Sequence, residues 1–470
     1  MKQLNRILGY LNIGDAEYPF HFETEDFILR VYPPTMKKWS EDMFGILENF
    51  GLSPKTHEWI GLKRITGITS QHYKIIFCVS DNPSSENGFK EYNVVWLLYH
   101  SEKYDANAIN GLRLSGGDIN YFLPAERALE SKIHFKEEFI VDSLSVTSKS
   151  SEYLSGGKYR LSYGIDAELQ LRTYATLHHN NAGNPIEAGS LMLFNYSKPV
   201  NLDLVIKNIN ETRLLLAYSC YRGNIYIPTI EIYWMNEEQK RDFAGIMLFP
   251  RKSGAETNKK ANERIITYDF WGEKTCKMLT VIKNNKLSFH HVCKCIDDQR
   301  HYLSSRIIMI LAEFEREYRN IYGIDYLRSD RYKDLKEEVI DTLNQLASTK
   351  KSKERQYIKN YIKMISNNDD SFSSRVEAAL LDCEAIMKPF VMRKYNGIYE
   401  DIVPNIAVRA GQLRNGLAHS KLDMTFEPIN LSDIKIMEEL TYAIRLKKFA
   451  KDTAMIQKAI NNLFGENIAI

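Results

Sequence analysis

The fold of the C-terminal part of the chain is decided by the stretch Val403-Pro404-Asn405-Ile406-Ala407-Val408-Arg409-Ala410-Gly411-Gln412-Leu413-Arg414-Asn415-Gly416-Leu417-Ala418-His419-Ser420. On a helix that turns about 100° per residue, four apolar side chains share a sector of roughly 60°: Ile406, Ala410, Leu413 and Leu417. Arg414 lies on the border of this stripe, and the i, i+4 pair Asn415 and His419 lies on the far side. Three hydrogen-bonding side chains therefore project from the end of this helix without being used in its core.

The sequence around this stretch has the pattern of an all-α domain from 298 to 470. After about Asp297, glycine and proline become scarce and apolar residues recur every three or four positions. Side chains that can accept hydrogen bonds from a first helical turn predict N-caps at Ser371, Ser432 and Asp452. The predicted helices lie near 301–322, 331–347, 352–366, 372–392, 403–419, 433–449 and 453–464.

The residues before 298 favour strands and predict two β-rich domains, 1–130 and 131–297. The second domain contains an inserted helix at 201–222, where the apolar spacing becomes helical. The strand-like runs are residues 73–79, 93–99, 159–163, 167–174 and 225–233. The expected fold class is therefore α+β, a multidomain chain with a β-rich N-terminal region followed by a C-terminal all-α helical bundle.

Composition places the chain among globular proteins and excludes several classes. Its 470 residues exceed the roughly 250–300 at which a single core stops growing. The 62 basic and 60 acidic residues leave a net charge of +2, which argues against a polybasic binder of membranes or nucleic acids. No apolar run approaches the roughly 18 residues that cross a bilayer, and the first residues lack a signal-peptide pattern. We therefore expect a cytoplasmic protein without membrane contact, whose six cysteines stay thiols.

Arg414, Asn415 and His419 have the chemistry that RNA cleavage without a metal needs. An imidazole titrates near pH 6.5, so His419 can take the proton from a 2′-hydroxyl or return one as an acid. The planar guanidinium of Arg414 is always charged and matches the geometry of a phosphate with two donors. Asn415 can orient the histidine or the scissile phosphate. These three residues are the catalytic candidates.

Arg414-Asn415-Gly416-Leu417-Ala418-His419 resembles the R-x4-6-H signature of HEPN domains, in which a polar residue directly follows the arginine. Within that superfamily the chain is similar to the Apea-type proteins, anti-phage abortive-infection factors with a β-rich N-terminal region and a C-terminal HEPN bundle. Two further segments share the resemblance: residues 371–377, which open a helix within the bundle, and residues 204–232, where a helix precedes a strand.

The resemblance implies a metal-independent endoribonuclease that needs no cofactor and cleaves RNA, with transfer RNA as one candidate substrate. HEPN domains often pair so that two motifs face one cleft, which implies a homodimer or a higher homo-oligomer. Residues 1–297 are then expected to sense a phage protein that triggers the nuclease. The alternative is a catalytically silent HEPN domain that dimerises or binds a ligand or RNA, with Arg414 and His419 as ordinary surface residues.

A second candidate is a basic ridge on the predicted helix 352–366. Successive steps of four residues align its cations, and two tyrosines accompany them. Phosphates of RNA would match such a ridge, and tyrosines can stack on unpaired bases. The alternative is a solvated helix face that also carries Glu354. The candidate RNA-binding residues are Lys351, Arg355, Lys359, Lys363 and Tyr357, with Tyr361 alongside.

A third cluster of thiols and imidazoles lies near the predicted junction of the β-rich and helical regions: Cys276, His290, His291, Cys293 and Cys295. Zinc sites generally use cysteine pairs separated by two to four residues, and Cys293 and Cys295 are one residue closer. We therefore expect buried thiols and structural histidines, with no metal. A zinc-dependent enzyme at this junction is the alternative.

Overall fold

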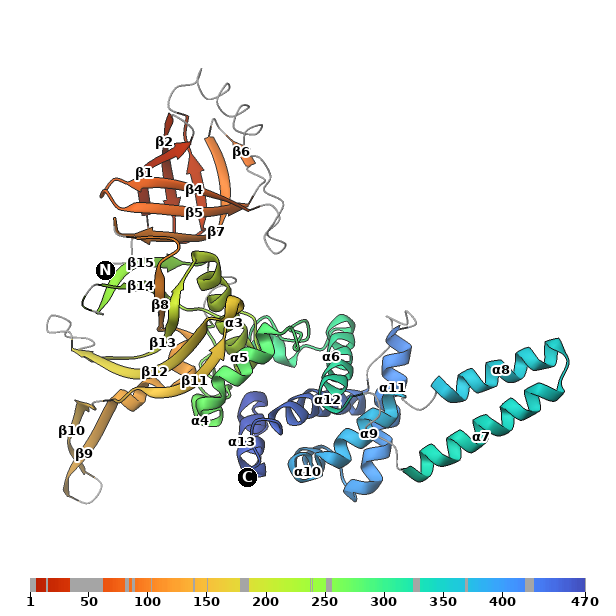
Figure 1. The fold of residues 1–470 in the computed structure, drawn as a ribbon. Coiled ribbons are helices and arrows are strands. Elements are labelled where there is room, and N and C mark those ends of the chain that lie inside the picture. Colours follow the sequence, from red (N-terminus) through yellow and green to blue (C-terminus); the bar gives the residue numbers. More distant parts are fainter. Residues whose placement is uncertain are drawn as a thin grey trace. The chain divides into compact units, whose positions relative to one another are not determined.

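The computed structural model divides the chain into two compact units, each described here by itself (Figure 1). Unit 1 comprises Met1–Ala217, Asn224–Thr257 and Gly272–Thr280, and unit 2 comprises Tyr218–Gly223, Asn258–Trp271 and Val281–Ile470. This division does not test the predicted boundary near residue 130, which stays a prediction. The structure describes residues 6–469 except 14–15, 34–61, 81–83, 87–88, 103, 138–139, 150, 178–185, 237, 239, 251–255, 324–329, 368–370 and 419–426.

Unit 1 begins with a small sheet that closes on itself. Its strands are β1 (Arg6–Ile13), β2 (Ala16–Glu23), β3 (Ile28–Val31), β4 (Leu62–Thr69), β5 (Lys74–Ser80) and β7 (Phe89–His100). They pair antiparallel in the order β7-β3-β2-β1-β4-β5, and β5 pairs back with β7. Because side chains alternate along a strand, every second residue points inward. Phe20 and Phe22 of β2 meet Phe77 of β5 there, with ring centroids 5.2 and 5.3 Å apart.

The long strand β7 also pairs with a second group of strands in unit 1. These are β8 (Ile109–Ser115), β11 (Leu154–Arg160), β12 (Asp166–Leu177), β13 (Ile186–Val200), β14 (Thr229–Met235) and β15 (Arg241–Leu248), in the order β11-β12-β13-β8-β14-β15-β7. The expected inserted helix is α3 (Leu202–Cys220), and Asn208 within it bonds the Tyr159 hydroxyl of β11. The other elements are β6 (Ser84–Glu86), α2 (Asp118–Phe122), η1 (Ala125–Ala128), the pair β9 (Leu129–Glu137) and β10 (Ile140–Ser148), η2 (Ser162–Gly164) and η3 (Gly272–Lys274). The helix α5 (Thr275–Lys283) begins in unit 1, and its residues from Val281 on belong to unit 2.

Unit 2 is helical and contains most of the C-terminal part of the chain. Its elements are α4 (Tyr268–Trp271), η4 (Asp297–Arg300), α6 (Ser304–Tyr322), α7 (Asp330–Thr349), α8 (Ser352–Asn367), α9 (Phe372–Asp382), α10 (Glu384–Lys394), α11 (Tyr399–Ala418), α12 (Pro428–Leu446) and α13 (Thr453–Phe464). The expected fold class, a β-rich N-terminal region followed by an all-α C-terminal region, is confirmed. No helix in the described ranges is both long enough and apolar enough to cross a membrane.

The ends of these helices test the predicted caps. Ser371 accepts a hydrogen bond from the Ser374 amide, and Asp452 accepts bonds from the Ala454 and Met455 amides, so both N-caps are confirmed. The predicted cap at Ser432 is wrong, because Glu427 caps α12 in a capping box with Asn430 and Pro428 starts the helix. The single helix predicted at 372–392 is two helices, because the backbone of Cys383 leaves helical geometry at φ −101° and ψ 16°.

The core of unit 2 includes residues from well before 298. The rings of Tyr218 and Tyr442 stack with centroids 4.5 Å apart, and Trp271 meets Phe449 edge-on at 5.4 Å. The buried carboxylate of Glu438 accepts hydrogen bonds from the hydroxyls of Tyr221 and Tyr302. The segments at 218–223 and 258–271 are therefore structural parts of the helical unit.

Candidate functional site

The close crossing of α11 over α9 places the predicted motif. Gly411 of α11 is buried at this crossing, where a Cβ would lie 2.1 Å from the Ser373 hydroxyl oxygen. Only glycine allows the two helices to approach this closely without a shift. One turn further along α11, Arg414 consequently reaches the region where α6 and α9 also contribute side chains.

Glu315 of α6 is the centre of this region, because three arginines from three helices approach its carboxylate. Arg375 of α9 donates from Nη1 to Oε1 at 2.6 Å, and Arg319 of α6 donates from Nη2 to the same oxygen at 2.9 Å. The Nη2 atom of Arg414 lies 3.7 Å from Oε2. One carboxylate thus faces three guanidinium groups.

The three arginines differ in their exposure. The Arg375 side chain is only 5% exposed and lies in the first turn of α9, directly behind the Ser371 cap. The side chains of Arg319 and Arg414 are 55% and 44% exposed. The buried Arg375 therefore holds the Glu315 carboxylate from the protein interior. Arg319 and Arg414 present their donors to solvent, and this arrangement suits an anion with several oxygens.

The predicted apolar stripe of α11 and its polar border lie as expected. Ile406, Ala410, Leu413 and Leu417 are buried, whereas Arg414 and Asn415 are exposed. Arg414 Nη1 lies within 3.4 Å of Asn415 Oδ1, so the structure brings these two catalytic candidates together. His419 lies outside the described residues. Its position relative to Arg414 stays a prediction.

Glu315, Arg319 and Arg375 were not among the candidates from the sequence. Arg375 lies in the segment 371–377 that contributed to the family resemblance, and Glu315 and Arg319 form an i, i+4 pair on one helix. Such pairs are common on solvated helices, so the spacing alone does not mark a site. The crossing of α9 and α11 creates the cluster, and no local pattern encodes that crossing.

The candidate RNA-binding residues lie on or beside α8. Arg355, Lys359, Lys363 and Tyr357 belong to the helix, and Lys351 directly precedes it. All five are exposed, with Tyr357 at 61%, and within the described residues none of the four cations has an ion-pair partner. The helix packs on α7, and its Ile358 is buried. The basic ridge is thus solvent-facing, as both interpretations of it require.

In the described parts of the chain, no three His, Cys, Asp or Glu side chains gather closely enough to hold a metal ion, and this holds for the thiols and imidazoles near the expected junction. Burial raises the pKa of Cys276 and of Cys293 to about 12, so both remain thiols at neutral pH. Burial lowers the pKa of His291 to about 3, so its ring is neutral. His290 is exposed and Cys295 is partly exposed.

The arrangement at the end of α11 can hold an anion and stabilise negative charge that builds on it. The exposed guanidinium groups supply the donors, and Glu315 with the buried Arg375 limits where Arg414 can move. A proton-transfer group would complete a cleavage site, and the described residues around Arg414 include no histidine within ion-pair distance of Glu315. No family model, no curated protein and no solved structure matches this chain.

Proposed function

We propose that this chain is an anti-phage defence effector of the Apea-type HEPN class, a metal-independent endoribonuclease that cleaves RNA. The observation that carries the proposal is the position of Arg414 in a surface cluster of guanidinium groups, next to Asn415 and five residues before His419. The exposed guanidinium groups of Arg319 and Arg414 offer donors that suit the oxygens of a phosphodiester. The sequence pattern supplies the general base that the cluster needs.

In the proposed reaction, His419 removes the proton from the 2′-hydroxyl on the 5′ side of the scissile bond. The 2′-oxygen attacks phosphorus, the bond from phosphorus to the 5′-oxygen breaks, and the departing oxygen takes up a proton. Arg414 holds the non-bridging oxygens while negative charge builds on them. Asn415 orients the phosphate or the imidazole. The products are a 2′,3′-cyclic phosphate and a 5′-hydroxyl, and the sum of the steps consumes no water.

The basic ridge of α8 is the proposed secondary contact for the RNA. Its cations are exposed and unpaired within the described residues, and Tyr357 offers an accessible ring to an unpaired base. A loop of transfer RNA presents both unpaired bases and closely spaced phosphates, so it is the substrate class we propose to test first.

Two further parts of the proposal concern assembly and control. A two-fold pairing of the helical units would place two sets of Arg414, Asn415 and His419 around one phosphate. A phage protein recognised by residues 1–297 would act as the trigger. Such a trigger must bind the active arrangement more tightly, and a shift from 1:99 to 99:1 needs about 5.5 kcal/mol of differential affinity.

The deciding experiment compares wild type with Arg414→Ala and His419→Ala in an RNA-cleavage assay and in a phage challenge. Each substitution should lower the cleavage rate by about 10² to 10³ and abolish protection, because each removes a group that acts in the transition state. Arg393→Ala is the matched control, since Arg393 is another exposed arginine of the helical unit. Full cleavage and protection by a well-expressed His419→Ala protein would refute the nuclease.

A catalytically silent domain that dimerises or binds RNA is the second candidate. The Arg414 guanidinium lies 3.7 Å from Glu315, and this neighbour reduces the charge available to a substrate. Under this alternative, purified wild type binds RNA or forms dimers but leaves RNA intact. RNA binding that Lys359→Ala weakens, without cleavage under any trigger, would favour it.

A further inference from the structure

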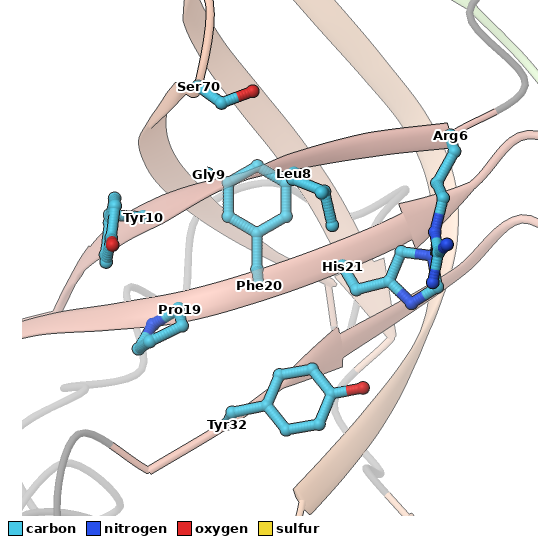
Figure 2. A pocket seen from close by; sticks show the side chains of 9 residues that line it. All are labelled: Arg6, Leu8, Gly9, Tyr10, Pro19, Phe20, His21, Tyr32 and Ser70. Carbon is cyan, nitrogen blue, oxygen red and sulfur yellow. Dashed lines mark hydrogen bonds between the residues drawn. The ribbon is translucent and has the colours of Figure 1, made fainter.

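A pocket of about 360 Å³ opens on the closed sheet of unit 1, and the proposed nuclease chemistry gives it no role (Figure 2). It is lined by side chains of β1 and β2 and by residues just beyond β3 and β4: Arg6, Leu8, Gly9, Tyr10, Pro19, Phe20, His21, Tyr32 and Ser70. Its volume lies at the lower end of the roughly 300–1,000 Å³ of small-molecule sites. A compound with one ring system and one charged group would fill it.

The alternation of β1 explains why Arg6, Leu8 and Tyr10 face outward. Ile7 and Leu11 are buried in the interior of the closed sheet, whereas Arg6, Leu8 and Tyr10 are exposed on its outer side. Tyr10 is 52% exposed and Leu8 is 48% exposed. Leu8 and Tyr10 therefore present apolar surface to the pocket from the outer side of β1.

The pocket has an aromatic part and a cationic part. Figure 2 shows Tyr10 and Pro19 toward one end and Arg6 beside the His21 ring at the other. Tyr32 adds a second phenol ring, which packs against Phe89 with centroids 5.4 Å apart. This contact holds the Tyr32 ring, while the Tyr10 ring is free to stack on a flat ligand.

His21 orients Arg6 at the cationic end. Arg6 Nε donates a hydrogen bond of 2.7 Å to Nε2 of His21, which is 8% exposed. Burial and the adjacent Arg6 lower the pKa of His21, so the ring is neutral and can accept this bond. Glu23 Oε1 also lies 3.1 Å from Nε2, and this carboxylate is shared with Arg30 at 3.7 Å. The bond to His21 uses only Nε of Arg6, and Glu23 lies opposite Arg6 in the pairing of β1 with β2.

We propose that this pocket binds a nucleoside phosphate, with the base stacked on Tyr10 and the phosphate held by Arg6. An exposed phenol ring can stack on any base, and a guanidinium anchored through Nε still offers its terminal donors to phosphate oxygens. The ligand is a free nucleotide or the nucleotide unit of a single-stranded RNA, since both present this chemistry. The inference does not depend on the nuclease proposal.

The test is calorimetric titration of full-length His419→Ala protein, in which RNA would not be consumed, with AMP, adenosine, inorganic phosphate and a hexa-adenylate. AMP should bind, and Tyr10→Ala and Arg6→Gln should each weaken AMP binding about tenfold, because the first removes the ring that stacks on the base and the second removes the charge that holds the phosphate. Asn12→Ala is the matched control on the same exposed side of β1 and should leave AMP binding unchanged. Circular dichroism confirms that each variant is folded.

Titration with hexa-adenylate separates the two sources of the ligand. The quantity compared is the loss of affinity that Tyr10→Ala causes relative to the parent protein. A larger Tyr10-dependent loss for hexa-adenylate than for AMP identifies RNA as the ligand, and the reverse identifies a free nucleotide. The proposal is overturned if AMP does not bind at millimolar concentration, if Tyr10→Ala and Arg6→Gln bind AMP like the parent, or if inorganic phosphate alone binds as tightly as AMP.

Discussion

Arg375, in the first turn of α9, donates a hydrogen bond of 2.6 Å from its buried guanidinium to the Glu315 carboxylate of α6. The two residues are 60 positions apart in the chain, so their hydrogen bond joins α6 to α9. It also fixes the carboxylate whose second oxygen lies 3.7 Å from Arg414. Glu315 therefore acts as a positioning residue in the proposed site, because it restricts where the Arg414 guanidinium can lie.

Glu315→Gln should reduce both stability and RNA cleavage. The substitution removes the negative charge shared by Arg319, Arg375 and Arg414, so like charges then face one another around a buried guanidinium. Loss of a charged hydrogen-bond partner costs about 1–3 kcal/mol of unfolding free energy, measurable by urea denaturation. Glu354→Gln, on the exposed side of α8, should change stability by less than about 0.5 kcal/mol.

A positioning role also predicts a distinct kinetic result for Glu315→Gln. The released Arg414 should hold the phosphate less well in the transition state, so kcat should fall more than KM rises. If Glu315→Gln lowered stability but left kcat unchanged, Glu315 would be a structural residue only.

The sequence predicted the helical unit well where the apolar pattern lies within a single helix. The apolar stripe of α11 is an example, because spacing alone predicts the burial of its four residues, Ile406, Ala410, Leu413 and Leu417. The closed sheet could not be predicted in this way. The strand 73–79 was expected and corresponds to β5, but its pairing with both β4 and β7 depends on contacts distant in the sequence.

The errors in the helical unit have local causes. Neither glycine nor proline marks the break at Cys383, so the apolar pattern continues through it. Ser432 has the side chain of a good cap, but Glu427 and Pro428 begin the helix earlier. The cluster around Glu315 could not be predicted, since it arises from the crossing of α9 and α11 at Gly411.

RNA cleavage should be unaffected by EDTA and should leave 2′,3′-cyclic phosphate and 5′-hydroxyl ends. The proposed chemistry uses an imidazole and a guanidinium, and neither needs a metal ion. Enzymatic end-labelling distinguishes the two kinds of terminus, because a 5′-hydroxyl accepts phosphate directly. Products with 3′-hydroxyl ends, or loss of activity on chelation, would require a different mechanism.

The active protein should be a homodimer or an assembly of dimers. One copy offers a single Arg414 and a single His419, and a two-fold contact supplies a second set. Light scattering should give at least twice the mass of the chain, and specific activity should fall on dilution below the dissociation constant. A monomer with full, concentration-independent activity would contradict this expectation.

Replacing Glu313 of α6 should change how stability depends on pH. Burial raises the pKa of Glu313 to about 7 from an ordinary value of 4.5, and its Oε2 lies 4.0 Å from His291 Nδ1. The folded protein therefore keeps this proton where the unfolded chain has lost it, so the stability it contributes is lost as pH rises from about 4.5 to about 7. Relative to Glu313→Gln, wild type should lose about 2 kcal/mol between pH 5 and pH 8.

Urea denaturation of both proteins at the two pH values checks this difference. The opposite contribution of His291, whose lowered pKa favours the folded state at higher pH, is present in both proteins and largely cancels. Glu337→Gln on the exposed side of α7 is the control. A constant difference between wild type and Glu313→Gln across this pH range would show that Glu313 is ionised in the folded state.

A fragment of residues 298–470 should fail to unfold cooperatively, although it contains all eight long helices of unit 2 described from α6 to α13. The cut removes Tyr221, which bonds the buried Glu438, and Trp271, which packs on Phe449. Loss of a partner for the buried carboxylate lowers the free energy of unfolding by about 1–3 kcal/mol, and exposure of the aromatic surface lowers it by about 1–3 kcal/mol or more. Together these losses are a large part of the stability of one domain. Thermal denaturation should show a broad transition with binding of a hydrophobic dye, whereas a fragment of residues 218–470 keeps every segment of unit 2 and should unfold more sharply. If 298–470 melted as sharply and at the same temperature as 218–470, the segments before 298 would be dispensable for the helical core.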